Sequence, residues 1–160
     1  MTKKKKSHEA NIEAKTTYTF PGLHINVAMA VSNDIASIRY HGKRSKAIVD
    51  REYSTYVMDK FTCVNQACKI NGWGSKKIAI LIRGYPNNGY DATVYNQRCR
   101  SCNRLGILTI DVNSYVDRVA YRLRKWAGST NLVLQQYFSK NGPPHRQDLC
   151  EGCKRGVCQH

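Results

Sequence analysis

Eight residues of the chain have the types and the spacing of zinc ligands. In sequence order they are Cys63, Cys68, Cys99, Cys102, His145, Cys150, Cys153 and Cys158. Zinc takes four sulfur or imidazole ligands in a closed tetrahedral site, and two cysteines separated by two residues on a tight turn both reach one ion. The second and third cysteine pairs have this spacing, while four residues separate Cys63 from Cys68. The number of ligands predicts two structural Zn²⁺ ions.

A disulfide framework and unrelated buried thiols explain the cysteines less well. The chain has seven cysteines, an odd number. Its N-terminal sequence, MTKKKKSHEANIEAK, lacks the apolar segment of a secretion signal. Unrelated buried thiols would scatter singly, whereas six of the seven cysteines occur in short-range pairs. We therefore expect reduced, metal-bound cysteines in a protein of the cytoplasm, the nucleus or both.

The order of the ligands leaves their grouping open. A sequential arrangement gives the first four cysteines to one ion, and His145 with the last three cysteines to the other. A cross-braced arrangement would mix the pairs. His145 is preferred to His160 because it precedes a cysteine pair, whereas His160 is the final residue and is expected to fray. His8, His24 and His41 are interpreted as ordinary surface or core histidines.

The chain is strongly basic, with 26 lysines and arginines against 11 acidic residues and a formal net charge of +15. Seven bound thiolates lower this charge by 7 and two Zn²⁺ ions raise it by 4, which leaves +12. Residues 1–20 hold five lysines against Glu9 and Glu13, so most of the charge belongs to the rest of the chain. A basic surface attracts polyanions, which favours nucleic acid or an anionic membrane face. No stretch approaches the roughly 20 apolar residues of a membrane span.

The length of 160 residues suits one core, which bound metal would help to stabilise. Residues 1–20 have the composition of a flexible basic arm, and we expect a single zinc-binding domain over residues 21–160. A short helix is predicted from Pro21 to Val31. Residues 41–47 are predicted to form a basic loop, after which the chain leads into the first cysteine pair.

Three strands are predicted after the first cysteine pair. Residues 78–82, IAILI, are apolar throughout, so this strand is expected to be buried on both faces. The turn residues 85–89, YPNNG, and the β-prone residues 91–98 predict a hairpin. Residues 105–111, LGILTID, predict a third strand. The Cys99–Cys102 turn would then lie between the second and third strands and hold one end of the sheet.

The most regular helical pattern begins at Asn113 or Ser114 as N-cap and runs to about Ala127, with Gly128 as the C-terminal stop. Its apolar residues recur at helical spacing, and its other face is interpreted as solvated. That face carries Arg118, Arg122 and Lys125, with Arg124 nearby. Residues 131–138 form a further short element of unassigned type. Together these elements predict an α+β fold, with a small antiparallel sheet and one long amphipathic helix stapled by two structural zinc sites.

Four sequence elements resemble the 3CxxC-type zinc-finger family. They are FTC at 61–63, WGSKK at 73–77, YNQRCRSCN at 95–103 and HRQDLCEGCKRGVC at 145–158. That family includes fungal single-domain proteins, the receptor-transporting proteins of animals and the C-terminal domain of the zygote arrest proteins. The long helix, SYVDRVAYRLRKWAG, is most similar to the fungal members. The resemblance covers residues 53–158, about two-thirds of the chain.

The resemblance implies a zinc core over residues 53–158 and matches His145 to the histidine of the family. Two features depart from the family pattern. The first pair is C-x4-C where the family name implies C-x2-C. There is also no C-terminal hydrophobic segment of the kind that membrane-tethered receptor-transporting proteins carry, so a role at the membrane is not expected.

The sequence argues against an enzyme. Catalytic zinc usually keeps an open position beside three protein ligands, whereas the eight ligands fill two coordination spheres. A nucleobase deaminase would need an H-x-E element and a Pro-Cys-x-x-Cys element. Neither occurs, since Arg and Gln follow His145 and Leu precedes Cys150. Glu151, inside the last cysteine pair, is expected to face solvent.

Two binding functions are left, and no small-molecule substrate is expected. In the first, the domain binds RNA or another single-stranded nucleic acid through basic residues, with exposed tyrosines for base stacking. The basic residues are Lys76, Lys77, Arg98, Arg100 and Arg104, and the tyrosines are Tyr85, Tyr90 and Tyr95. The resemblance to the zygote arrest proteins, which are RNA-binding translational regulators, implies the same function. In the second, the domain is an adaptor for protein partners or a trafficking or chaperone-like factor, as the resemblance to the receptor-transporting proteins implies.

Overall fold

The computed structural model describes residues 15–42, 46–130, 132 and 145–158. Its helices are α1 (His24–Val31), α2 (Val112–Trp126) and α3 (Glu151–Lys154), with 3₁₀ turns at Pro21–Leu23 and Gln147–Leu149. Its strands are β1 (Thr17–Tyr18), β2 (Arg39–Tyr40), β3 (Arg51–Thr62), β4 (Gly72–Tyr85), β5 (Gly89–Tyr95) and β6 (Ile107–Ile110). Residues 1–14 of the expected arm, and nearly all of the element expected at 131–138, lie outside the described residues. None of the helices described here has the length and apolar character that a membrane-spanning helix needs.

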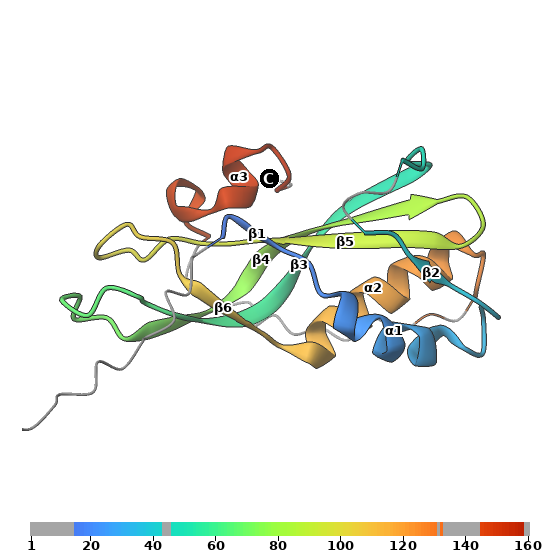
Figure 1. Cartoon of the computed structure of the whole chain (residues 1–160), viewed down its shortest axis with the longest axis horizontal. Helices are drawn as coiled ribbons and strands as arrows, with labels where there is room; N and C mark the ends of the chain where they lie inside the picture. Colours follow the sequence, from blue (N-terminus) through green and yellow to red (C-terminus); the bar gives the residue numbers. More distant parts are fainter. Residues whose placement is uncertain (1–14, 43–45, 131, 133–144, 159–160) are drawn as a thin grey trace, which may run out of the picture.

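A six-stranded sheet forms the centre of the molecule (Figure 1). Its strands lie in the order β1-β5-β4-β3-β6, and β2 adds a short parallel pairing with β5. The predicted hairpin between β4 and β5 is confirmed, with Tyr85 opposite Gly89. Asn87 and Asn88 in its turn have φ angles of 60° and 61°, a left-handed conformation that asparagine tolerates. The sheet and helices together confirm the α+β class.

Different parts of the chain cover the two faces of the sheet (Figure 1). On one face, α1 and α2 pack against the sheet around Ile78, Ile80 and Ile82, all fully buried. On the other face, Ala79 and Leu81 of β4 pack with Tyr95 of β5 against Val157 and Cys158 from the C-terminal segment. The prediction that residues 78–82 are buried on both faces is therefore confirmed.

The positions of three strands differ from the prediction. β3 is a 12-residue strand that the sequence pattern does not predict, because polar residues interrupt its apolar alternation. β6 pairs with β3, with Phe61 opposite Leu108, and not with β5. The outer edge of β5 is occupied by β1 and β2, so the chain after the Cys99–Cys102 turn crosses to the far edge of the sheet. Because β1 lies at Thr17–Tyr18, the sheet begins inside the range expected for the arm.

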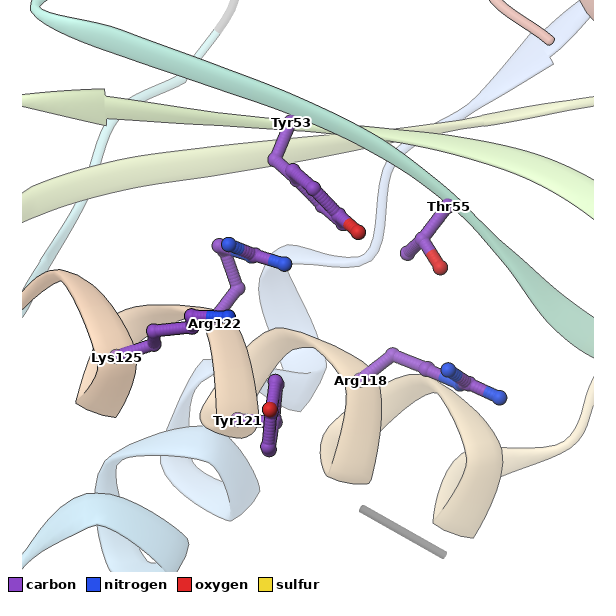
Figure 2. A pocket seen from close by; sticks show the side chains of 6 residues that line it. All are labelled: Tyr53, Thr55, Arg118, Tyr121, Arg122 and Lys125. Carbon is purple, nitrogen blue, oxygen red and sulfur yellow. The ribbon is translucent and has the colours of Figure 1, made fainter. Parts of the chain in front are cut away.

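α2 is the predicted amphipathic helix, but it begins ahead of the expected capping residues. Asp111 is its N-cap and accepts a hydrogen bond from the Ser114 N–H at 2.9 Å. Gly128 follows the helix with a φ of 82°, which confirms the expected stop. The prediction of a solvated basic face is wrong for Arg118 and Arg122, which are 7% and 9% exposed. This side of α2 faces β3 and not solvent (Figure 2).

Asp59 of β3 is a buried carboxyl group next to the start of α2. It is 5% exposed, and its Oδ1 accepts a hydrogen bond from the Asp111 N–H at 2.5 Å. Burial raises the pKa of the Asp59 carboxyl to about 8, against a smaller lowering by that hydrogen bond. The folded protein thus keeps a proton that the unfolded chain releases near pH 4. Stability is therefore lost as the pH rises from about 4 to about 8.

We expect the substitution Asp59→Asn to remove this pH dependence. Asparagine keeps an oxygen that accepts from the Asp111 N–H, but it has no proton to lose. Between pH 6 and 8, the unfolding free energy of the wild-type protein should fall relative to the variant by up to about 1.4 kcal/mol per pH unit. Urea unfolding of the zinc-loaded proteins measures this slope. Asp50→Asn, which removes an exposed carboxylate, is the control, and parallel pH profiles for wild type and Asp59→Asn would contradict the assignment.

Candidate metal centres

The first four cysteines form one group. Their Sγ atoms all lie within 4.8 Å of one another. Cys63 Sγ is 3.6 Å from Cys102 Sγ, and Cys68 Sγ is 3.8 Å from Cys99 Sγ. In a tetrahedron with Zn–S bonds of about 2.3 Å, the sulfurs lie about 3.8 Å apart, so a Zn²⁺ ion fits among them. Cys68 is a full member of this group despite the wider spacing of its pair.

Loops at one end of the sheet position this first group. Cys63 directly follows β3, and Cys68 lies in the loop between β3 and β4. Cys99 and Cys102 lie in the connection from β5 to β6. The Asn103 N–H donates to the Cys99 carbonyl at 2.8 Å, and Asn103 has a φ of 60°, which closes this turn tightly. A zinc ion here would tie the end of the β3–β4 hairpin to the chain that carries β6.

Hydrogen bonds from backbone amides lower the pKa of two of these thiols, which favours the thiolate form that binds metal. The Arg104 N–H hydrogen-bonds to the Cys102 sulfur and lowers the pKa of that thiol to about 7. The Ile70 N–H likewise lowers the pKa of Cys68. Burial raises the pKa of Cys63 to about 12, so this thiol holds its proton until a metal replaces it. Zinc binding to the group therefore releases protons and weakens as the pH falls.

His145 and the last three cysteines form the second group, which confirms the sequential arrangement and excludes the cross-braced one. Their ligand atoms also lie within 4.8 Å of one another. His145 Nε2 is 3.2 Å from Cys153 Sγ and 3.9 Å from Cys158 Sγ. Cys150 Sγ is 3.6 Å from Cys158 Sγ. These separations match one nitrogen and three sulfurs around a single tetrahedral zinc, in which N and S lie roughly 3.6 Å apart.

The second group packs on a face of the sheet and not at its end. The Sγ of Cys150 caps α3 by accepting a hydrogen bond from the Cys153 N–H at 3.4 Å. Between them, Gly152 lies against β4, and a Cβ at this position would lie 2.5 Å from the Cβ of Ala79. Glycine thus lets the zinc-binding turn approach the sheet closely. On the His145 side, the Tyr56 ring of β3 contacts the imidazole at a centroid distance of 5.9 Å.

The spacing and geometry of these ligands agree with the comparison with known families. The sequence model of the 3CxxC family, described as a zinc-binding domain, matches residues 56–156. The chain belongs to this family. The matched range contains seven of the eight ligands, and Cys158 lies two residues beyond it. No significant match was found among curated proteins or among solved structures.

Both sites of this 3CxxC domain offer four protein ligands, the composition of structural zinc sites. Cys99 and Cys150 are 0% and 1% exposed, so each ion would sit partly inside the fold. In small zinc-binding modules, the free energy of binding the metal is also free energy of folding. The two ions are therefore expected to stabilise the segments that carry their ligands.

An ion pair connects the two zinc-binding turns of the 3CxxC domain. Arg98 Nε donates to Glu151 Oε1 at 3.0 Å, and Arg98 Nη1 donates to the Asn103 carbonyl at 3.0 Å. Arg98 precedes Cys99 of the first group, and Glu151 lies inside the second. Glu151 is 6% exposed, so its expected solvent-facing position is wrong. Arg98 is committed to this internal contact, whereas Lys76, Lys77, Arg100 and Arg104 are exposed.

The three tyrosines expected to stack on bases belong to the folded core. Tyr85, Tyr90 and Tyr95 are 8%, 0% and 6% exposed, so the expectation of exposed stacking residues is wrong. The Tyr85 hydroxyl donates to Asp91 at 2.5 Å, and the Tyr90 hydroxyl is 2.9 Å from His24 Nδ1. Both faces of β4 and β5 are covered by other parts of the chain. Aromatic side chains of these strands are therefore buried whichever face they point to.

Sequence reasoning missed a cluster of side chains between α2 and β3. They line a hollow of about 130 Å³ (Figure 2) and are Tyr53, Thr55, Arg118, Tyr121, Arg122 and Lys125. The sequence does not predict β3, and without that strand the basic side of α2 has nothing to face. The available signal was the pair of arginines four residues apart on the helix, which lie on one side of it.

Proposed function

We propose that this domain binds RNA or another single-stranded nucleic acid through the surface around the first zinc site. The knuckle surface is defined by Lys60, Lys76, Lys77, Arg100 and Arg104. All five are exposed, and this exposure beside a rigid metal site is the observation that carries the proposal. Within the described part of the chain, the ion pairs do not engage these five side chains. Cations without such partners are available for phosphates.

The sheet next to these cations carries small side chains. Lys60 of β3 lies opposite Gly74 of β4 and opposite Thr109 of β6, and all three are exposed. Paired residues of neighbouring strands point to the same face, so the lysine rises beside a glycine and a threonine. Small residues let a sugar-phosphate chain approach the backbone closely. This arrangement supports contact with the phosphates of a flexible single strand.

A binding role accords with the ligand sets of the two zinc sites. Four protein ligands leave no coordination position for a substrate, so we propose a domain that is not an enzyme. The seven cysteines, all within the described part of the chain, form no disulfide with one another, which suits the reducing conditions of the cytoplasm and the nucleus. We propose that the protein acts in one or both of these compartments.

Binding to a protein partner is the second candidate function, and one surface feature favours it. Ile25 and Met29 of α1 are 65% and 72% exposed and lie one helical turn apart. Exposed apolar pairs on a helix are frequent in protein interfaces. An adaptor of this kind would bind its partner with little dependence on salt, which distinguishes it from a nucleic-acid-binding domain.

We expect the affinity for mixed-sequence single-stranded RNA to fall as salt rises. The slope of log affinity against log salt should be about −0.7 per phosphate contact. Replacing Arg100 and Arg104 together with Ala should weaken binding and flatten the slope by about one to two units. Zinc content should stay unchanged, since neither residue is a ligand. Fluorescence anisotropy with a labelled RNA at several salt concentrations measures both quantities.

The control for this experiment removes the same charge from another part of the surface. Arg39 and Lys46 are exposed, and Arg39 lies opposite Gly89, at the other end of β5 from Cys99. Replacing both with Ala should change the slope less than the Arg100 and Arg104 substitutions do, as should removal of residues 3–6. If the zinc-loaded protein shows no salt-sensitive binding to RNA even at low ionic strength, the nucleic-acid proposal fails and the adaptor function takes its place.

A further inference from the structure

The hollow between α2 and β3 is strongly cationic (Figure 2). Among the described residues that line it are three cations, Arg118, Arg122 and Lys125, and no carboxylate. Arg118 and Arg122 are 7% and 9% exposed. The buried Arg122 guanidinium has lost solvation, and an anion bound between it and the exposed Lys125 would restore favourable electrostatic interactions. We propose that this hollow, the arginine hollow, binds a phosphate group.

Arg122 is held in an orientation that suits such a ligand. Its Cζ lies 3.2 Å from the centre of the Tyr53 ring, so the ring stacks on the guanidinium. Stacking uses the face of the guanidinium and leaves the N–H groups at its edge. The Nε of Arg122 is buried and has no hydrogen-bond partner among the described residues. A guanidinium edge donates two parallel hydrogen bonds to two oxygens of a phosphate.

The other lining residues surround the same space with donors. Figure 2 shows Arg118 extending below Thr55, and Arg122 lying below Tyr53. The hydroxyls of Thr55 and the tyrosines supply neutral donors. Lys125 is exposed and brings its charge from the solvent side. The hollow thus has its fixed cations inside and one flexible cation outside.

The volume and the charge favour phosphate over smaller or weaker anions. A cavity of about 150 Å³ holds benzene, which has six heavy atoms, so a hollow of about 130 Å³ admits the five heavy atoms of a phosphate. A phosphate monoester carries about −1.5 to −2 charges at pH 7. It therefore balances more of the positive charge of Arg122 and Lys125 than a chloride or a single carboxylate does.

Two sources supply this chemistry, namely free inorganic phosphate and the terminal phosphate of a larger molecule such as an RNA 5′ end. The arginine hollow involves the first half of β3, whereas the knuckle surface adjoins Cys63 after the last residue of that strand. The two sites therefore do not overlap. Binding of phosphate in the hollow does not depend on the proposed nucleic-acid function.

The test is a titration of the full-length, zinc-loaded protein with inorganic phosphate. Calorimetry or amide NMR at constant ionic strength, balanced with potassium chloride, should show saturable binding to one site, with shifts centred on residues 53–55 and 118–125. Arg122→Gln should weaken binding by about tenfold or more, because it removes a charged donor. Lys125→Ala should weaken phosphate binding several-fold. Because Lys125 is exposed, this variant should still fold even if Arg122→Gln does not. Lys46→Ala removes the same charge from an exposed position outside both proposed sites and should leave binding unchanged.

A second arm compares short RNAs that carry a 5′-phosphate or a 5′-hydroxyl. An affinity gain from the 5′-phosphate that Lys125→Ala removes identifies the terminal phosphate as the source. Equal affinities for the two RNAs, together with saturable binding of inorganic phosphate, identify the free anion. The proposal is overturned if neither probe binds saturably, or if Lys46→Ala weakens phosphate binding as much as Lys125→Ala does.

Discussion

Metal analysis of the purified protein is expected to return two zinc ions per chain, and chelation is expected to unfold the region from Phe61 to Cys158. The reason is the pair of four-ligand groups, each with its ligand atoms within 4.8 Å. Zinc binding contributes on the order of 10 kcal/mol per site in small modules. A whole domain is stable by only about 5 to 15 kcal/mol. The loss of both ions should therefore exceed what the apolar core retains.

Substitutions of single ligands should show which zinc ion is lost from which site. Cys99→Ser should leave one zinc per chain at the second site, and Cys150→Ser should leave one at the first. Cys68→Ser should lose as much metal as Cys99→Ser, because the two sulfurs lie 3.8 Å apart in the same group. Metal content with circular dichroism measures both effects, and recovery of the spectrum on adding zinc back to chelated wild type is the control. About one ion or none in the wild-type protein, or an unchanged spectrum after chelation, would refute the assignment.

The substitution Gly152→Ala is expected to displace the second zinc-binding turn from the sheet. The new Cβ would lie 2.5 Å from the Cβ of Ala79 and 3.2 Å from the Cys158 sulfur. The turn cannot move away freely because Cys150 and Cys153 bind the same ion on either side of it. Such overpacking typically costs about 1 to 3 kcal/mol, and here part of the cost falls on metal affinity. We therefore expect a lower thermal midpoint and faster loss of one zinc to a competing chelator.

Two further variants make this prediction specific. Ala79→Gly removes the atom that the new Cβ would meet, so the double variant with Gly152→Ala should recover part of the stability and the metal retention. Gly22→Ala is the matched control, because no atom lies within 4 Å of a Cβ at that position. A Gly152→Ala protein that holds two zinc ions as firmly as wild type would show that the turn is not pressed against β4.

The metal ligands could be predicted from the sequence because their constraint is local. Cysteines two residues apart, such as Cys99 and Cys102, imply a shared ion whatever the surrounding fold. The grouping of the pairs could not be predicted, because it depends on β6 crossing to pair with β3. The apolar residues 78–82 were predictable for a related reason, since a strand without polar residues must be covered on both faces.

Several of the features that escaped prediction depend on β3. This strand mixes polar and apolar residues, so its pattern shows no clear period. Without it, Arg118 and Arg122 are assigned to solvent, although they face Tyr53 and Thr55 in the structure. Glu151 failed for a different reason. Glu151 lies between two cysteines of a metal-binding pair, where side chains often face solvent, and only the tertiary structure brings Arg98 to its side chain.

In this protein the range that the family model matches and the range that folds together begin at different residues, and the N-terminal strands and α1 lie between the two starting points. The family match begins at residue 56, inside β3, which itself begins at Arg51. A chain that began there would lack Val27 and Val31, which are fully buried, and would leave the outer edge of β5 without its partners. We therefore expect the unit that folds cooperatively to be larger than the range that the family model matches, and to include the chain from Thr17 onward. The segment ahead of the zinc core contributes buried residues and strands to the same fold.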